Sequence, residues 1–277
     1  MTTLQGAATD PIGIFDSGMG GLTVLRAIHG RLPHERLLYL GDTARLPYGT
    51  KSRDTVARYC LQAAEKLVER GIKMLVVACN TATSAALPAL REAFAPLPVI
   101  GVVEPGAAAA VRASRTGHIA VIATEGTIHG GAYQRAIGAL RPDARIIGQP
   151  CTLFVALAEE GWMDGPLVEG IAARYLNHIF HGDAPDTPDT LLLGCTHFPP
   201  LQTALQHVVG PDVTLVDSAA TTAQAVEQEL RRHALLCDTG SPQPHFLTTD
   251  DAIRFARVGS LFLGANIPEN SVERVDL

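Results

Sequence analysis

Two cysteines in matching settings are the residues of this chain best suited to chemistry. Cys79 follows the apolar run Met74–Ala78, and Cys195 follows the apolar run Leu191–Gly194. A polar Asn-Thr pair comes directly after the first cysteine, and a Thr-His pair comes after the second. Thiols exchange protons readily when their surroundings lower the pKa. Two thiols in equivalent positions therefore predict a pair that acts from opposite sides of one small molecule.

Further polar side chains at the ends of expected strands form a candidate binding site. In a parallel sheet, ligands bind at the carboxyl ends of the strands, where loops and helix N-termini converge. Hydroxyls, an amide and the N–H groups of helix starts suit a small anion such as a carboxylate or a phosphate. The candidate groups are Asp16-Ser17, Pro47-Tyr48-Gly49, Cys79-Asn80-Thr81, Thr124 and Cys195-Thr196-His197.

Several of these residues also have a purely structural interpretation. A buried cysteine at the end of a strand is commonly a small packing residue, and this is the role we expect for Cys60, Cys151 and Cys237. Asp16 and Ser17 would suit the cap of the helix that follows them. The paired setting of the other two cysteines favours chemistry over packing at those positions.

Short apolar runs alternate with helical segments along the first half of the chain. This alternation, with strands that are apolar throughout, is typical of a parallel sheet that is covered by helices on both faces. The expected strands are 12–15, 37–40, 74–78 and 99–103, and the expected helices are 22–28, 53–70 and 82–94.

The pattern then restarts, which indicates a duplicated architecture. A strand at 119–122 leads into Thr124 and a glycine pair, much as the strand at 12–15 leads into Asp16 and a glycine pair. Weak internal repetition of this kind favours two similar lobes. We therefore predict an α/β protein with two similar lobes, each a mostly parallel sheet flanked by helices, and an active site in the cleft between them.

The expected boundaries of the lobes follow from the same pattern. The first lobe is predicted to comprise 11–103 and 214–266, because the strand at 213–216 is expected to return the chain to it. The second lobe is predicted to comprise 104–213, with a Pro/Asp-rich connector at 183–189. Residues 1–10 and 267–277 are expected to be terminal extensions.

Composition narrows the class of protein. The 277 residues are 47% apolar and 18% charged, which is typical of a compact enzyme. A formal net charge of −6, without a basic cluster, argues against a surface for nucleic acid. No apolar run reaches the ~18 residues of a membrane span, and the N-terminus lacks the apolar part of a signal peptide. The five cysteines contain no CxxC pair, so we expect no zinc site and a reducing cytoplasm.

Five segments in series resemble the aspartate/glutamate racemase family. The resemblance runs from about residue 12 to 265, and the segments follow one another in the order expected for that family. Each motif is weak by itself, but five in order are specific. The matching segments are 16–21, 39–43, 47–49, 78–82 and 194–199.

The resemblance implies cofactor-independent racemisation of glutamate by two bases. One cysteine removes the α-proton from one face, and the other delivers a proton to the opposite face. Carried over by motif, Cys79 acts on D-glutamate and Cys195 acts on L-glutamate. Asp16 is expected to accept the proton of Cys79, and His197 and Glu159 are expected to assist Cys195.

The resemblance also implies a substrate-binding set and a biological setting. It predicts an enzyme of the cytoplasm that supplies D-glutamate for peptidoglycan synthesis, with a homodimer as a common state of such enzymes. It assigns the polar groups of the substrate to Ser17, Tyr48, Gly49, Asn80, Thr81, Thr196 and His197, and the positions at strand ends add Asp16 and Thr124.

Three alternatives stay open on the sequence. An aspartate racemase would use the same chemistry, because one methylene is worth only ~1–3 kcal/mol of discrimination. A thiol hydrolase could be built on Cys195 and His197, but it would leave Cys79 without a role. A non-catalytic amino-acid-binding protein of two lobes would explain the hydroxyls and the cleft, but not the paired thiols.

Overall fold

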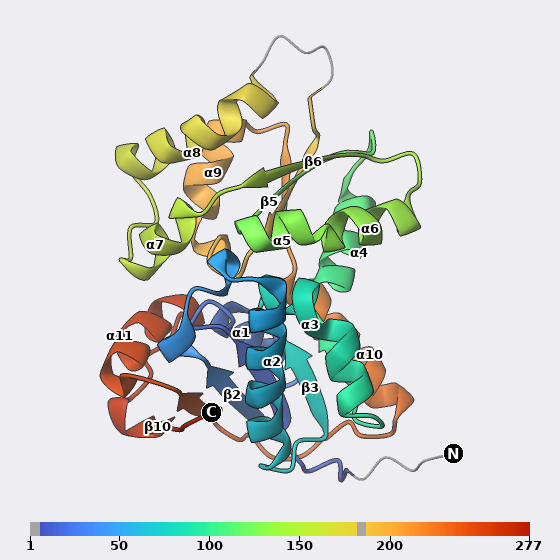
Figure 1. Ribbon diagram of the computed structural model, residues 1–277, viewed down its shortest axis with the longest axis vertical. Helices are drawn as coiled ribbons and strands as arrows, with labels where there is room; N and C mark the ends of the chain where they lie inside the picture. The colour runs from blue at the N-terminus through green and yellow to red at the C-terminus, as the bar shows by residue number, and fades with distance from the viewer. Residues whose placement is uncertain (1–5, 182–186) are drawn as a thin grey trace.

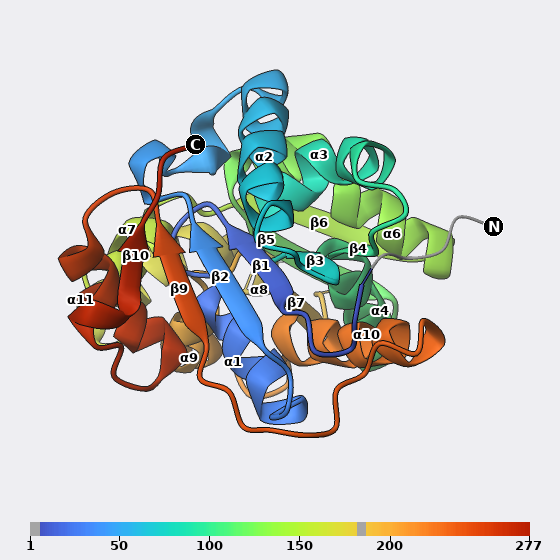
Figure 2. The same cartoon turned by 90° about the horizontal axis from the view of Figure 1, so that it is seen from below.

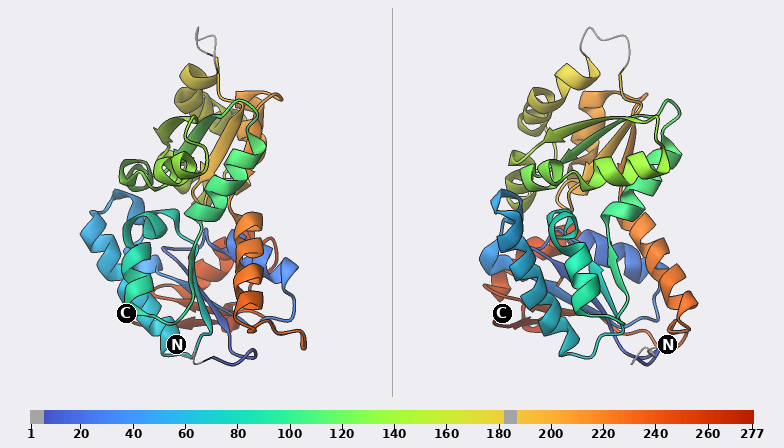
Figure 3. Two further views of the ribbon diagram at one scale, coloured as in Figure 1. Left: turned by 90° about the vertical axis from the view of Figure 1, so that its right-hand side faces the viewer. Right: turned by 45° about the vertical axis from the view of Figure 1, so that its right-hand side comes forward.

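The computed structural model describes residues 6–181 and 187–277, and it consists of two α/β lobes stacked along the long axis (Figure 1). Each lobe has its own parallel sheet with helices on both faces, as two further views show (Figure 3). Part of the expected extension at 1–10 and most of the expected connector at 183–189 lie outside the described residues.

The first lobe is built on a parallel sheet of six strands in the order β10-β9-β2-β1-β3-β4. The central strands are apolar and buried on both faces, as expected for strands covered by helices. The strands are β1 (Ile12–Asp16), β2 (Leu37–Gly41), β3 (Met74–Val77), β4 (Val99–Gly101), β9 (His245–Thr248) and β10 (Val272–Arg274).

Helices cover the two faces of this sheet with separate apolar clusters (Figure 2). One face packs against α1 (Leu22–Arg31), α10 (Ala219–Arg232) and α11 (Ala252–Leu263). The other face packs against α2 (Arg53–Val68) and α3 (Asn80–Ala93). Short 3₁₀ turns complete the lobe: η1 (Thr43–Arg45), η2 (Tyr48–Thr50) and η4 (Glu269–Ser271).

The second lobe repeats this plan with a parallel sheet of four strands in the order β6-β5-β7-β8. The strands are β5 (His118–Ala123), β6 (Arg145–Pro150), β7 (Thr190–Gly194) and β8 (Thr214–Asp217). The helices are α4 (Val103–Ala113), α5 (Glu125–Gly130), α6 (Ala132–Leu140), α7 (Leu153–Glu159), α8 (Pro166–Phe180) and α9 (Gln202–Val209), with the turn η3 (Pro199–Leu201). None of the described helices combines the length and the apolarity that crossing a membrane requires.

Two expectations about the end of the chain are wrong. The segment from 214 does not open the return to the first lobe, because β8 pairs with β7 in the second sheet and the return begins at α10. The tail 267–277 is not a mere extension, since β10 adds the sixth strand of the first sheet beside β9. Both strands are short and lie at sheet edges, where the pairing partner depends on contacts distant in the sequence.

Two smaller differences concern the strands themselves. The strand expected at 99–103 stops at Gly101, and α4 begins at Val103, where the chain passes into the second lobe. β6 has no counterpart among the predicted strands. Its sequence contains a glycine, a glutamine and a proline, and all six of its residues are exposed or half-buried, so it lacks a clear apolar pattern.

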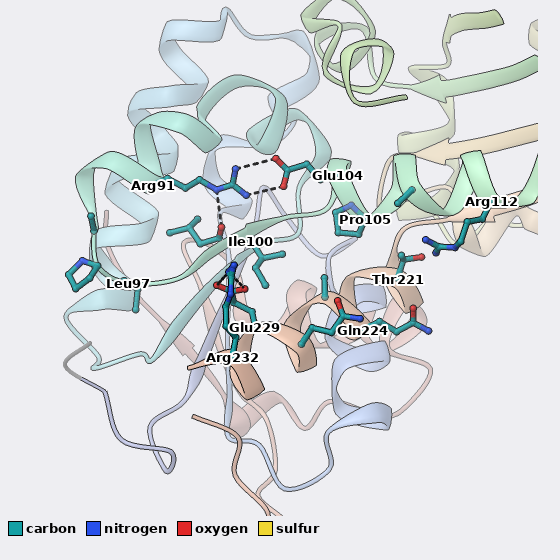
Figure 4. A pocket seen from close by; sticks show the side chains of 16 residues that line it. Arg91, Leu97, Ile100, Glu104, Pro105, Arg112, Thr221, Gln224, Glu229 and Arg232 are labelled. Carbon is teal, nitrogen blue, oxygen red and sulfur yellow. Dashed lines mark hydrogen bonds and ion pairs between the residues drawn. The ribbon is translucent and has the colours of Figure 1, made fainter. Parts of the chain in front are cut away.

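The two lobes also contact each other between α4 and α10, and a cavity of about 650 Å³ lies there between these helices and the end of α3 (Figure 4). The two guanidinium NH groups of Arg91 donate to the two oxygens of Glu104 at 3.1 and 2.9 Å (Figure 4). Both side chains are exposed, so this pair contributes at most about 1 kcal/mol to stability. Neither Cys79 nor Cys195 lines this cavity.

A buried ion pair lies in the first lobe at the amino-terminal end of β3. Lys73 Nζ lies 2.6 Å from Glu35 Oε2, and both side chains are fully buried. The ammonium also donates to the carbonyl oxygen of Leu235 at 2.8 Å, and Glu35 Oε1 accepts the backbone N–H of Cys237 at 2.8 Å. The start of β3 is thereby tied to two loops distant in the sequence.

We expect Lys73→Met to destabilise the protein by about 3–5 kcal/mol, because it leaves the Glu35 carboxylate buried without its cation. The double variant Lys73→Met/Glu35→Leu should lose much less, since it removes both charges. Urea unfolding followed by circular dichroism measures both free energies. A double variant as unstable as the single one would show that the penalty does not come from the unpaired charge.

Candidate active site

Each of the two cysteines follows the carboxyl end of a strand, one in each lobe, and the same cavity is lined by both. Cys79 follows β3 and caps α3, with its sulfur accepting the backbone N–H of Ala82 at 3.4 Å. Cys195 follows β7. Both thiols line one narrow cavity. Its other lining residues are Ser17, Leu46, Pro47, Tyr48, Gly49, Asn80, Thr81, Thr124, Val155, Thr196 and His197.

Cys79 is surrounded by groups that keep it protonated. Its thiol is buried and donates to Ser17 Oγ at 3.5 Å. Burial and the nearby negative charge of Asp16 raise the pKa of Cys79 to about 12. In the ligand-free site this residue is therefore a proton donor rather than a base.

Asp16 is fully buried at the end of β1 and connects the two lobes. Its carboxylate accepts the backbone N–H of Gly18 at 3.1 Å and the hydroxyl of Thr196, from the second lobe, at 3.5 Å. Burial raises the pKa of Asp16, although the charge of His197 and backbone N–H groups oppose the rise. A buried carboxyl group with a raised pKa is a candidate for proton exchange with a neighbouring thiol.

Cys195 faces a cationic group instead. His197 Nδ1 lies 3.8 Å from Cys195 Sγ, and His197 Nε2 lies 3.3 Å from Glu159 Oε1. Burial would lower the pKa of His197, but its contacts with Cys195 and Glu159 outweigh this and raise it to about 10. Burial would raise the pKa of Glu159, but His197 and Arg254 lower it. An imidazolium held by a carboxylate therefore lies beside Cys195.

A hydroxyl cluster closes the cleft beside Cys79. Thr81 Oγ1 at the start of α3 lies 2.8 Å from Thr124 Oγ1, which follows β5 in the other lobe. Thr127 completes the cluster at 3.1 Å from Thr81 and 3.0 Å from Thr124. Thr127 was absent from the predicted set, although its position three residues after the cap of α5 is a signal that could have identified it.

Asn80 offers an unused donor. Its Oδ1 accepts the hydroxyl of Tyr133 from α6 at 2.6 Å, whereas its buried Nδ2 has no partner among the described residues. Because Asn80 lines the cavity, this free N–H₂ group is suited to an anionic ligand. Tyr133 was not predicted, and nothing local in the sequence could indicate a contact between α6 and the start of α3.

The hydroxyl of Tyr48 has a structural partner. It donates to the buried carboxylate of Asp42, which also accepts from Arg45 Nε at 2.6 Å and from Thr249 Oγ1 at 2.9 Å. Tyr48 thus lines the cavity with its phenol tied to Asp42. The Asp42 carboxylate fixes the Leu46–Gly49 loop, a role that its motif alone did not reveal.

The remaining predicted residues are brought together as well. Of the thirteen predicted residues, eleven line the cavity, and the other two, Asp16 and Glu159, lie behind it against Thr196 and His197. Two apolar lining residues, Leu46 and Val155, were not predicted because an isolated apolar side chain carries no chemical signal.

Comparisons with known proteins agree with this geometry. The family model for Asp/Glu/Hydantoin racemase matches residues 22–226. The glutamate racemase of Geobacter metallireducens is 48% identical over 257 residues, which is 92% of this chain and 93% of that protein. This chain belongs to the aspartate/glutamate racemase family. The resemblance found in the sequence is thereby confirmed, and the protein is an isomerase of the racemase class.

Solved structures of the family have the same fold. Glutamate racemase RacE1 from Bacillus anthracis superposes with a TM-score of 0.90 at 37% identity, covering 97% of this chain and 98% of that one. Glutamate racemase from Francisella tularensis, solved in complex with D-glutamate, gives 0.89 at 34% identity with the same coverage. The prediction of two parallel-sheet lobes flanked by helices is confirmed.

The two thiols of this racemase should differ in reactivity. At pH 7 we expect iodoacetamide to alkylate Cys195 about tenfold faster than Cys79, because a cationic imidazole lies beside Cys195, whereas burial and Asp16 raise the pKa of Cys79 to about 12. His197→Gln should slow alkylation of Cys195 and leave Cys79 unchanged. Peptide mapping by mass spectrometry gives both rates, and faster labelling of Cys79 would contradict the assigned asymmetry.

Proposed function

We propose that this racemase interconverts L-glutamate and D-glutamate by a cofactor-independent mechanism with two cysteine acid/base groups. The observation that carries the proposal is the pair of thiols at equivalent strand ends of two lobes, both of which line one narrow cavity. Inversion at a carbon requires a base on one face and an acid on the other, and two facing lobes can supply both.

In the direction from L- to D-glutamate, Cys195 acts first. Its thiolate removes the α-proton, and the electron pair of the broken C–H bond delocalises into the α-carboxylate. The thiol of Cys79 then gives its proton to the opposite face of the carbon. The reaction ends with a thiol at Cys195 and a thiolate at Cys79, which is the starting state for D-glutamate.

The groups around each thiol support these roles. The imidazolium of His197, held by Glu159, compensates the negative charge on Cys195. Asp16 shares the buried surroundings of Cys79 and has a raised pKa, so it is suited to take up the proton of Cys79 when D-glutamate arrives. The ammonium group of the substrate favours the thiolate at whichever cysteine acts as the base.

Polar groups of both lobes would hold the substrate. The unpartnered Nδ2 of Asn80 and the N-terminus of α3 suit a carboxylate, and preorganised donors of this kind stabilise the charge that develops there during proton abstraction. The further binding residues that we propose are Asp16, Ser17, Tyr48, Gly49, Thr81, Thr124, Thr196 and His197. At Tyr48 the contact would come from the backbone or the ring, since its hydroxyl is bound to Asp42.

Glutamate is preferred over aspartate on the strength of the relatives. The Geobacter protein is named a glutamate racemase, and the Francisella enzyme was solved with D-glutamate. We further propose that the enzyme acts in the cytoplasm, where thiols stay reduced, and supplies D-glutamate for peptidoglycan. A homodimer also remains a prediction, which sedimentation velocity would test.

The first test follows α-proton exchange and optical activity together. With either enantiomer of glutamate in D₂O, the purified protein should remove the α-proton signal in the NMR spectrum and the circular dichroism of the ligand. Cys79→Ala and Cys195→Ala should each reduce racemisation by at least about a thousandfold, because each removes one of the two groups. Cys237→Ala, which changes a cysteine outside the cavity, is the matched control.

The outcomes separate the candidate functions. Activity on aspartate and not on glutamate would keep the chemistry and change the substrate. Binding of glutamate without exchange, unaffected by serine at both cysteines, would overturn the proposal in favour of a binding protein. Absence of racemisation, together with a hydrolytic activity that Cys195→Ala abolishes and Cys79→Ala leaves intact, would favour a thiol hydrolase.

Asp16→Asn should affect the two directions unequally. The two enantiomers have equal free energies in water, so kcat/KM must be the same in both directions, and asymmetry can appear only in kcat and KM separately. Because Asp16 serves Cys79, we expect kcat from D to L to fall about a hundredfold and kcat from L to D to fall less. Initial rates at saturating substrate, followed by circular dichroism, test this. Equal losses of kcat in both directions would contradict the assignment.

A further inference from the structure

A helix of the first lobe reaches the charged group behind Cys195 in the second lobe. A guanidinium nitrogen of Arg254, on α11, donates to Glu159 Oε2 at 3.2 Å. The other oxygen of this carboxylate contacts His197 Nε2 at 3.3 Å, and His197 Nδ1 lies 3.8 Å from Cys195 Sγ. The chain of contacts therefore starts in one lobe and ends at the proposed acid/base group of the other.

Apolar contacts hold the two lobes together at the same place. α7, which carries Glu159, lies beside α11 (Figure 1). Ala158, next to that glutamate, is fully buried in the apolar cluster of the first lobe together with Phe255 and Phe262. The ring of Phe262 also meets the His197 ring edge-on at 5.2 Å between centroids. α11 thus touches the histidine directly and reaches its carboxylate partner through Arg254.

The pair of Arg254 and Glu159 does more for orientation than for stability. The side chain of Glu159 is 10% exposed and that of Arg254 is 43% exposed, and a pair open to water on one side adds little to folding. Its geometric effect is larger, because each carboxylate oxygen is held by a different partner. Without Arg254, one oxygen of Glu159 would lose its partner and the carboxylate could rotate away from the imidazole.

We propose that Arg254 is a positioning residue, which acts through Glu159 to hold His197 charged and oriented beside Cys195. Because Arg254 belongs to the other lobe, this support is complete only when α7 and α11 are in contact. The approach of the lobes over the substrate and the readiness of Cys195 are therefore coupled. This inference rests on the proposed two-thiol reaction.

The primary test compares steady-state racemisation by Arg254→Gln with that by the wild-type enzyme. We expect kcat to fall about tenfold, with a change in KM below about threefold, because the residue orients a proton-transfer group and does not touch the substrate. The acid limb of the pH profile of kcat should move to higher pH, since loss of the cation raises the pKa of Glu159. Arg254→Lys should restore part of the rate by restoring the charge.

Two further variants distinguish positioning from a general structural role. Arg257→Gln removes an exposed arginine one turn along the same helix and should behave as wild type. In a Glu159→Gln background, Arg254→Gln should lower kcat by less than a further factor of about two, because Arg254 acts through the carboxylate of Glu159. Equal losses in both backgrounds, or a wild-type pH profile in Arg254→Gln, would overturn the inference. A wild-type enzyme that does not racemise would instead overturn the proposed function.

Discussion

Inversion of a carbon atom requires an acid and a base on opposite faces of it, and this constraint explains the two lobes. A parallel sheet gathers the carboxyl ends of all its strands at one edge, so a single sheet approaches a small ligand from one side. Here two such edges face each other. The ends of β1 and β3 carry Asp16 and Cys79, and the ends of β5 and β7 carry Thr124 and Cys195.

Although the lobes repeat one plan, their electrostatics differ. A buried carboxyl group accompanies Cys79, whereas an imidazolium with its own carboxylate accompanies Cys195. Because most of these groups are buried, their charges are poorly screened and act strongly on one another. Burial and the charge of Asp16 raise the pKa of Cys79 to about 12, so this thiol holds its proton. In the proposed reaction from L- to D-glutamate, Cys79 gives its proton to the substrate carbon and Cys195 takes up the α-proton.

Several contacts that cross the cleft are polar, in contrast to the apolar cores within each lobe. Thr81 meets Thr124, Asp16 meets Thr196, and Tyr133 meets Asn80. The apolar cores are largely separate, and the chain passes between the lobes at the start of α4 and before α10. Polar interfaces of this kind permit relative motion of domains, which substrate entry into a narrow cavity requires.

The sequence by itself determined the alternation of strands and helices, the two cysteines and the polar residues beside them, because these depend on local apolar runs and motifs. It could not assign β8 and β10 to their sheets, since an edge strand of three or four residues takes its partner from distant contacts. Tertiary structure also decided that Tyr133 orients Asn80 and that Arg254 supports Glu159. Such pairings join residues far apart in the chain, and only the packing of the two lobes brings them together.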